Sequence, residues 1–299
     1  MSYYQGAFIT LNDVIKQYAL STSAATGVSA TTQATIDAMD LVQKTQLKQL
    51  LFDVSDEIMT QWHRTFLPFV HTYTVKARSS AWRKGWSSCN GELLFNLLRL
   101  PNADLLSLSS VTLNDTVLDS AYYDLSPDSL YPAWQVSFDS AYVTLPTGIA
   151  FNTELELAGT WGYHENPLDM WRANGALLGN ITSSATSFTA TTGTIETCQY
   201  LKIGTEFLFV TAVTVGATDT ITVERGVRGS TAAAHTLADV IYAYRQMPAV
   251  IKATRRRVVN LMQKMPELAN LVQIGESAVQ ASTESIDLQI DKRTLWESV

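Results

Sequence analysis

The four histidines of the chain form none of the patterns that bind a metal or activate a nucleophile. His63 lies in a helical pattern, His71 in a strand-like pattern, His164 in a turn and His235 in an alanine-rich run. None has a Cys or a second His at the spacing of a metal site, and the sequence lacks a Gly-x-Ser-x-Gly or Ser-His-Asp order. We therefore predict no catalytic residues, no metal site and no cofactor, and a protein that is not an enzyme.

Asp53, Asp56 and Glu57 are carboxylates that lie close together in sequence. They fall beside the apolar face of a long helical pattern, where a solvated helix face is the usual interpretation. A hydrolase of the two-carboxylate kind would need a pair of carboxylates at a defined separation across a cleft. The spacing of these three residues does not predict such a pair.

A basic segment interleaved with tryptophan is the first candidate for binding. It contains Lys76, Arg78, Trp82, Arg83 and Lys84, and we expect it to be a loop. This composition is typical of a nucleic-acid contact or a subunit interface, so the loop could line a DNA channel or join two subunits. The alternative is a surface loop whose tryptophans cover a local core.

Two further arginine groups lie later in the chain. Arg255 and Arg256 lie in a helical pattern, where consecutive residues point in different directions. They could pair with an acidic partner ring, or they could belong to a solvated helix face. Arg225 and Arg228 flank glycines in a tight turn, and we expect them to hold its geometry. The turn does not match a phosphate loop, because no helix and no Lys-Thr pair follow it.

The C-terminal segment is the candidate for binding a partner protein or a neighbouring subunit. Ile286, Leu288 and Ile290 alternate with polar residues, and Leu295 and Trp296 follow them. An alternating terminal segment can add a strand to the sheet edge of a neighbour, and the tryptophan can anchor it in a pocket. The other interpretations are a strand in the chain's own sheet and a frayed terminus.

Helical and strand patterns define the elements that position these residues. Helices are predicted at 10–20, from residue 36 to the proline at 68, and at 247–265, with the last helix packed on the one that ends near Trp62. Short strands are predicted at 71–75, 93–100, 105–113, 122–125, 134–138, 142–145 and 154–163. The predicted fold class is α+β, a helical bundle of two N-terminal helices and one C-terminal helix with an antiparallel sheet.

The chain leaves this sheet at residues 159–167 (GTWGYHENP) and resumes the same domain at the helix from 247. The residues between them are richer in Thr and predict strands at 187–190, 200–203, 207–213, 220–223 and 240–244, an inserted all-β barrel or sandwich. We therefore predict a discontinuous core domain (1–167 plus 247–275), an inserted small β domain (168–246) and an extended tail (276–299).

Composition restricts the class of protein. The 299 residues are 46% hydrophobic and 16% charged, which is typical of a folded protein. A net charge of −7 disfavours a general nucleic-acid binder. The N-terminus lacks a secretory pattern and no window predicts a membrane span, so we expect the protein in a cytoplasm or in a particle assembled there, with Cys89 and Cys198 as free thiols.

The order of several short motifs resembles the head-to-tail adaptor (connector) proteins of tailed bacteriophages. The motifs are LP at 100–101, DLLSLSSVT at 104–112, AYYDL at 121–125, GTWGY at 159–163 and MPAVIKA at 247–253. The insert resembles a small β domain of phage virion proteins through IGTEFLFVT at 203–211 and ERGVRGSTAAAH at 224–235. The chain departs from the usual adaptor pattern by carrying this module inside the fold.

The resemblance implies a structural protein of the virion neck. Such a protein forms a homo-oligomeric ring, commonly a dodecamer, that docks on the capsid portal, receives a stopper or tail-terminator protein, and lets double-stranded DNA pass through its bore. The C-terminal segment often reaches the portal in that family, and no membrane is involved. Three alternatives are open: a stopper, a tail-completion protein, or a carbohydrate-binding β module that would use exposed aromatics such as Tyr242 and Tyr244.

Overall fold

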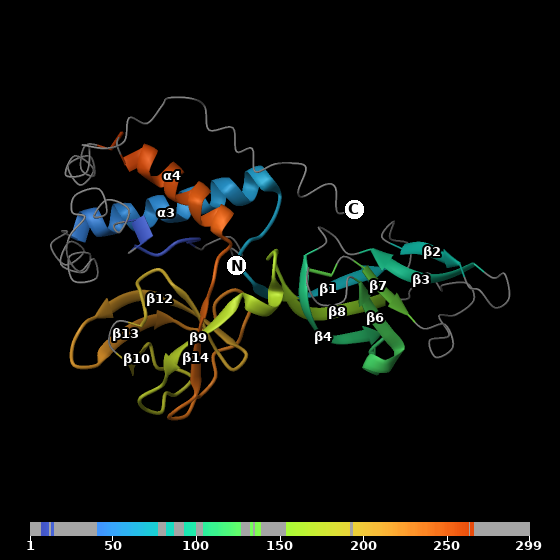
Figure 1. Ribbon diagram of the computed structural model, residues 1–299. Coiled ribbons are helices and arrows are strands. Elements are labelled where there is room, and N and C mark those ends of the chain that lie inside the picture. Colours follow the sequence, from blue (N-terminus) through green and yellow to red (C-terminus); the bar gives the residue numbers. More distant parts are fainter. Residues whose placement is uncertain are drawn as a thin grey trace.

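The described part of the chain is mostly β, with two helices and three antiparallel sheets (Figure 1). The computed structural model describes residues 7–11, 13–14, 41–76, 82–86, 93–99, 104–126, 132–133, 135–138, 154–191, 194–262 and 264–265. The helices are α3 (Leu41–Trp62) and α4 (Pro248–Met262). None of the helices in these ranges is long and apolar enough to span a membrane.

Two of the sheets have four strands each. The first has the order β1 (Phe69–Lys76), β8 (Glu154–Trp161), β4 (Leu105–Leu113) and β5 (Thr116–Val117). The second has the order β2 (Trp82–Trp86), β3 (Leu93–Arg99), β7 (Gln135–Phe138) and β6 (Tyr123–Ser126). A short 3₁₀ turn, η2 (Ser120–Tyr122), precedes β6.

The third sheet has six strands and lies in sequence between β8 and α4. Its order is β10 (Ser187–Ala190), β13 (Asp219–Glu224), β12 (Glu206–Thr214), β11 (Tyr200–Ile203), β14 (Val240–Tyr244) and β9 (Trp171–Ala176). The Leu178 N–H donates to the Thr189 carbonyl at 3.3 Å, so the chain after β9 returns to β10 at the opposite end of the strand order. A 3₁₀ turn, η3 (Pro167–Asp169), leads into β9.

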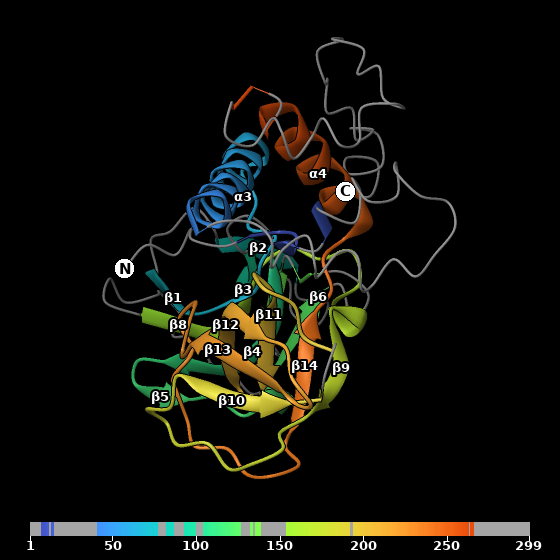
Figure 2. The same ribbon diagram turned by 90° about the vertical axis from the view of Figure 1, so that its left-hand side faces the viewer.

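The prediction of an α+β fold built on a three-helix bundle is wrong. The apolar face of α3, which includes Leu47, Leu51 and Val54, shares one core with α4 and with Tyr200 and Phe209 of the six-stranded sheet. The described helices therefore exclude water by packing on a sheet and not within a helical bundle. Figures 1 and 2 both show α3 and α4 above that sheet.

Two contacts fix α3 on the six-stranded sheet. The rings of Phe52 and Phe209 lie 5.7 Å apart between centroids. The Lys48 ammonium donates to the Thr211 carbonyl at 2.7 Å. The packing of α4 on α3 was predicted and is confirmed by their shared core.

The N-terminal residues 7–14 join the helices to the six-stranded sheet. Phe8 is buried, and its N–H donates to the Ser55 hydroxyl of α3 at 3.0 Å. Thr10 and Asp13 cap each other reciprocally, and the Leu11 N–H donates to the Thr197 carbonyl at 3.2 Å. Leu11, Asp13 and Val14 have helical backbone, while the rest of the predicted first helix lies outside the described residues.

A second core lies between the two four-stranded sheets. On β8, Leu155 and Leu157 are buried while Glu154 and Glu156 are exposed, which is the alternation of a strand with one face in the core. The Trp161 indole is also buried and donates to the His71 carbonyl of β1 at 2.9 Å. This core is separate from the core that α3 and α4 share with the six-stranded sheet. A third core is formed by the six-stranded sheet and its own loops.

The predicted strands agree with the structure in most of the described ranges. β4, β10, β11 and β14 match their predicted bounds residue for residue. β9 was missed, because WRANGA has only a short alternation, no β-branched residue and an interior glycine, and its pairing with β14 makes it a strand. The predicted strand at 142–145 lies outside the described residues.

Candidate functional site

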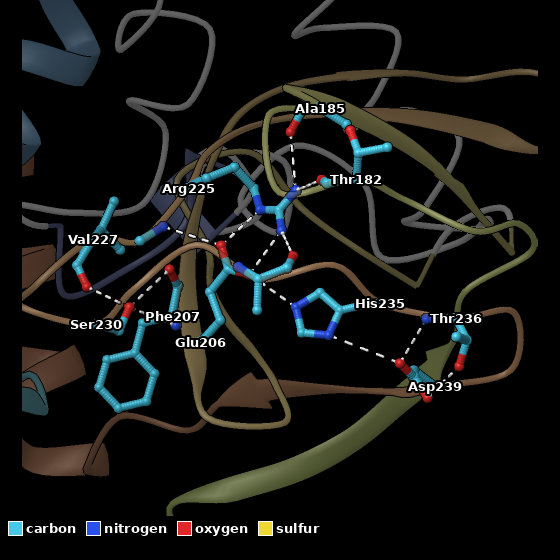
Figure 3. Close-up of polar contacts among 12 residues, drawn as sticks. Thr182, Ala185, Glu206, Phe207, Arg225, Val227, Ser230, His235, Thr236 and Asp239 are labelled. Atoms are coloured by element: carbon cyan, nitrogen blue, oxygen red, sulfur yellow. Dashed lines mark hydrogen bonds and ion pairs between the residues drawn. The ribbon is translucent and has the colours of Figure 1, made fainter.

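The most polar buried cluster in the described chain surrounds Glu206, at the first position of β12 (Figure 3). Its side chain is fully buried and forms a bidentate pair with Arg225, with Nε to Oε1 at 2.6 Å and Nη2 to Oε2 at 2.7 Å. This fork geometry is the strongest form of an arginine–carboxylate pair.

Three more donors complete the coordination of the Glu206 carboxylate. The Gly226 N–H reaches Oε1 at 3.1 Å, the Ala233 N–H reaches Oε2 at 3.1 Å, and His235 Nε2 lies 2.8 Å from Oε2. Burial acts to raise the pKa of Glu206, but the hydrogen bonds from Arg225, Ala233 and His235 and the charge of Arg225 outweigh it, so the pKa lies below its usual range. The group is therefore a carboxylate at neutral pH.

The Arg225 guanidinium also binds the loops that surround it. Nη1 donates to the carbonyls of Thr182 and Ala185, both at 3.0 Å, and Nη2 donates to the Ala233 carbonyl at 2.5 Å. One ion pair thus closes the loop 225–235 and fixes it to residues 182–185. The prediction that Arg225 holds turn geometry is confirmed.

His235 and Asp239 extend the cluster in a direction that could suggest proton transfer. His235 Nδ1 lies 3.8 Å from Asp239 Oδ2, and Nε2 contacts Glu206. A Glu–His–Asp series can move a proton only if one end meets a reacting group. Here the carboxylate oxygens of Glu206 accept hydrogen bonds from the Arg225 guanidinium and from backbone amides. None of the described contacts of Glu206 is with a nucleophilic side chain. The arrangement stabilises a loop.

Arg228 has a different role from Arg225, because it joins the same loop to β1. Its buried guanidinium donates to the carbonyls of Pro68 at 2.9 Å and Leu67 at 3.1 Å, while its own carbonyl accepts from the Val70 N–H at 2.8 Å. Next to it, Gly229 has φ +81°, and a Cβ there would meet the Val70 carbonyl oxygen. The loop 225–235 therefore ties the six-stranded sheet to the start of the first sheet.

The three arginines of α4 point in three directions, because successive helical residues are about 100° apart. Arg255 Nη2 lies 3.5 Å from Asp13 Oδ1 in the N-terminal segment. Arg257 forms a fork with Glu57 of α3, at 3.0 and 2.8 Å. Arg256 lies between them and is exposed. Of the two arginines predicted to bind a partner, Arg255 thus has a partner within the chain and Arg256 faces outward.

The acidic residues of α3 are mostly used in local contacts, as a solvated helix face would use them. Gln49 Nε2 donates to Asp53 Oδ1 at 2.8 Å, and Glu57 pairs with Arg257. Burial raises the pKa of Asp56, and the charge of Asp53 adds to that rise. The carboxylates do not converge on a cleft in the described residues.

Asp104 is a buried carboxyl that the sequence did not single out. It lies just before β4, and its Oδ1 is 4.0 Å from Arg64 Nη1. Burial raises its pKa to about 7, and Arg64 opposes the rise. The Arg64 guanidinium also lies 4.1 Å from the centroid of the Tyr163 ring. No sequence signal predicted this residue, because a single Asp at a strand start is usually exposed.

The basic segment predicted as a loop contains a strand. Trp82, Arg83 and Lys84 lie in β2, which pairs with β3 in the register Trp82 to Leu98. The loop prediction followed from composition, and the pairing with β3 makes the segment a strand. Lys76 ends β1. Arg78 lies outside the described residues, and so do the side chains of β2 and of Lys76. The five predicted tail residues also lie outside them: Ile286, Leu288, Ile290, Leu295 and Trp296.

The aromatics proposed for sugar binding differ in exposure. Tyr242 is exposed, but the Tyr244 hydroxyl donates to the Phe66 carbonyl at 2.6 Å and its ring contacts Trp171. Tyr244 therefore belongs to the junction below the helices. The described residues contain no group of three or more His, Cys, Asp or Glu that could hold a metal ion.

Comparison with known proteins gives no relative: no family model matches the chain, and neither a curated protein nor a solved structure matches it.

Proposed function

We propose that the chain is a structural subunit of the neck of a tailed bacteriophage, an adaptor that forms a ring between the capsid portal and the stopper or tail protein. The supporting observation is the path of the chain. Six strands, from β9 to β14, intervene between β8 and α4, and α4 then returns to pack on α3. The motifs that resemble adaptor proteins lie on both sides of these strands, up to GTWGY at 159–163 and again at MPAVIKA at 247–253, and the insert itself departs from the usual adaptor pattern.

The chemistry of the most polar cluster is consistent with a structural role. The described polar contacts of Glu206 and Arg225 close the loop 225–235 and fix it to residues 182–185. The Arg228 guanidinium joins this loop to the residues just before β1. A catalytic carboxylate would instead present a free oxygen toward a cleft. These residues fix the loop 225–235 between two sheets. A ring subunit needs such fixed contacts, because packaged DNA exerts pressure on it.

Charge supports passage of DNA in preference to its retention. A net charge of −7 gives a surface that repels phosphates on average, so DNA can slide through a ring of such subunits without strong binding. The ring would assemble in the host cytoplasm and function in the virion.

The test is reconstitution of the neck from purified components. The full chain is added to DNA-filled heads that contain portal and lack this protein, and ring formation and DNA retention are followed by electron microscopy. A parallel variant ends after Gln280. We expect the full chain to form a ring on the portal vertex, and the truncated chain to fail to do so.

Two other outcomes would refute the proposal. If the full chain does not bind heads but binds isolated tails, the protein is a stopper or tail-completion protein. If it binds neither but binds glycans, the six-stranded sheet is a carbohydrate-binding module. The intrachain use of Tyr244 makes the second outcome the less expected one.

A further inference from the structure

The outward face of α4 is a basic row in an acidic protein. Val250, Thr254 and Val258 mark the buried side of the helix. Lys252 and Arg256 are four residues apart on the opposite side, and both are exposed. Like charges at this spacing destabilise a helix slightly. Neither side chain has an ion-pair partner among the described residues, unlike Arg255 and Arg257 on the flanks.

A group of carboxylates lies at the start of β8 and the turn after β4. Glu154 and Glu156 are both exposed on the outer face of the first sheet. Asp115 lies in the turn beside them, because the Asn114 N–H donates to the Glu154 carbonyl at 3.0 Å. Val117, which is 66% exposed, follows on β5 and adds an apolar surface to this acidic end.

The two charged surfaces belong to different parts of the fold. α4 packs with α3 over the six-stranded sheet, whereas β8 and β4 belong to the first sheet (Figure 1). No ion pair among the described residues joins Lys252 or Arg256 to these carboxylates within one subunit. Two different complementary surfaces on one chain favour a head-to-tail contact between copies, which closes into a ring or continues as a filament.

We propose that the basic row of α4, Lys252 and Arg256, binds the acidic end of a second copy of this chain, formed by Asp115, Glu154 and Glu156. Charge complementarity identifies the occupant, because the exposed side chains at 252 and 256 are cations and those at 154 and 156 are carboxylates. Double-stranded DNA fits less well, since two cations on one helix face are few for a duplex-binding surface. The inference rests on the proposed function only for closure into a ring, and the contact itself is tested without phage components.

The experiment measures self-association of the full chain at low ionic strength by analytical ultracentrifugation. Four variants are compared with the wild type: R256E, E156K, the double variant R256E/E156K, and R172E. The control R172E reverses an exposed arginine on β9, away from both surfaces, and changes the net charge as R256E does.

We expect R256E and E156K each to weaken association by about tenfold or more, because a like-charge contact replaces an ion pair. The double variant should recover most of the loss, since the pair is restored with its signs exchanged. Association should also weaken as salt is added, because exposed charges are screened.

Three results would overturn the contact. The first is a wild type that stays monomeric at low salt and high concentration. The second is equal weakening by R172E, which would mean that net charge alone matters. The third is a double variant no better than either single variant. Failure of the portal experiment with an intact charge-swap result would refute the adaptor assignment and leave the contact standing.

Discussion

Replacing Glu206 with Gln should cost a large part of the stability of the six-stranded sheet. The substitution keeps the shape of the side chain and removes its charge, so the guanidinium of Arg225 stays buried without a counter-ion. Removal of one partner from a buried ion pair costs about 3–5 kcal/mol. Gln retains one oxygen that can still accept hydrogen bonds from the loop, so we expect about 2–4 kcal/mol in the free energy of unfolding.

The assay is urea unfolding of the full chain with the midpoint converted by the slope of the transition. The matched control is Glu224→Gln, a change of the same chemistry at an exposed position of β13. The control should change the free energy of unfolding by less than about 0.5 kcal/mol. A loss below about 1 kcal/mol in the Glu206 variant would refute the role assigned to the pair.

The pH dependence gives a second check on the same residue. Because the folded pKa of Glu206 lies below its unfolded value, its ionisation stabilises the fold above the unfolded pKa of about 4.3, and this contribution is lost as the pH falls toward the folded pKa. The wild type should lose stability through this acid window, and the Gln variant should lose less. Identical acid profiles would contradict the assignment.

Three further predictions concern other parts of the fold. Gly229→Ala should destabilise the protein by more than about 1 kcal/mol in thermal unfolding, because the positive φ and the Val70 carbonyl both oppose a Cβ; an unchanged midpoint would contradict the junction. Asp104 has a folded pKa raised to about 7, so its burial should make stability fall as the pH rises from about 4 to 7. Asp104→Asn should remove that fall and be the more stable protein at pH 8, by one to a few kcal/mol at most; a variant less stable than the wild type at pH 8 would show that the pairing with Arg64 dominates. Arg257→Ala should change the free energy of unfolding by less than about 1 kcal/mol, because its pair with Glu57 is nearly half exposed; a larger loss would indicate that the pair holds α4 in place.

Local patterns predicted much of the secondary structure. The alternation in 105–113 and 240–244 gave the bounds of β4 and β14, because a strand with one buried face shows its period in the sequence. The helical period predicted α3 and α4 as well, and the predicted helical residues 36–40 lie outside the described residues. The same patterns predicted that α4 packs on α3.

The errors arose where a neighbour decides the structure. β9 has a weak strand pattern of its own and is a strand because β14 pairs with it. The basic segment around Trp82 has the composition of a loop and is a strand because β3 pairs with it. Asp104 became notable only when the surrounding residues removed it from water.

The sequence by itself determined which faces of helices and strands are apolar, since that information repeats along the chain at a fixed period. It also determined the overall negative charge and the tight turn that Arg225 holds. Only the tertiary structure decided that a sheet covers α3, that Glu206 meets Arg225 and that Arg228 joins two sheets. These are contacts between residues 19 to 163 positions apart in sequence, and no local pattern encodes which distant surface will cover a given apolar face or pair with a given charge.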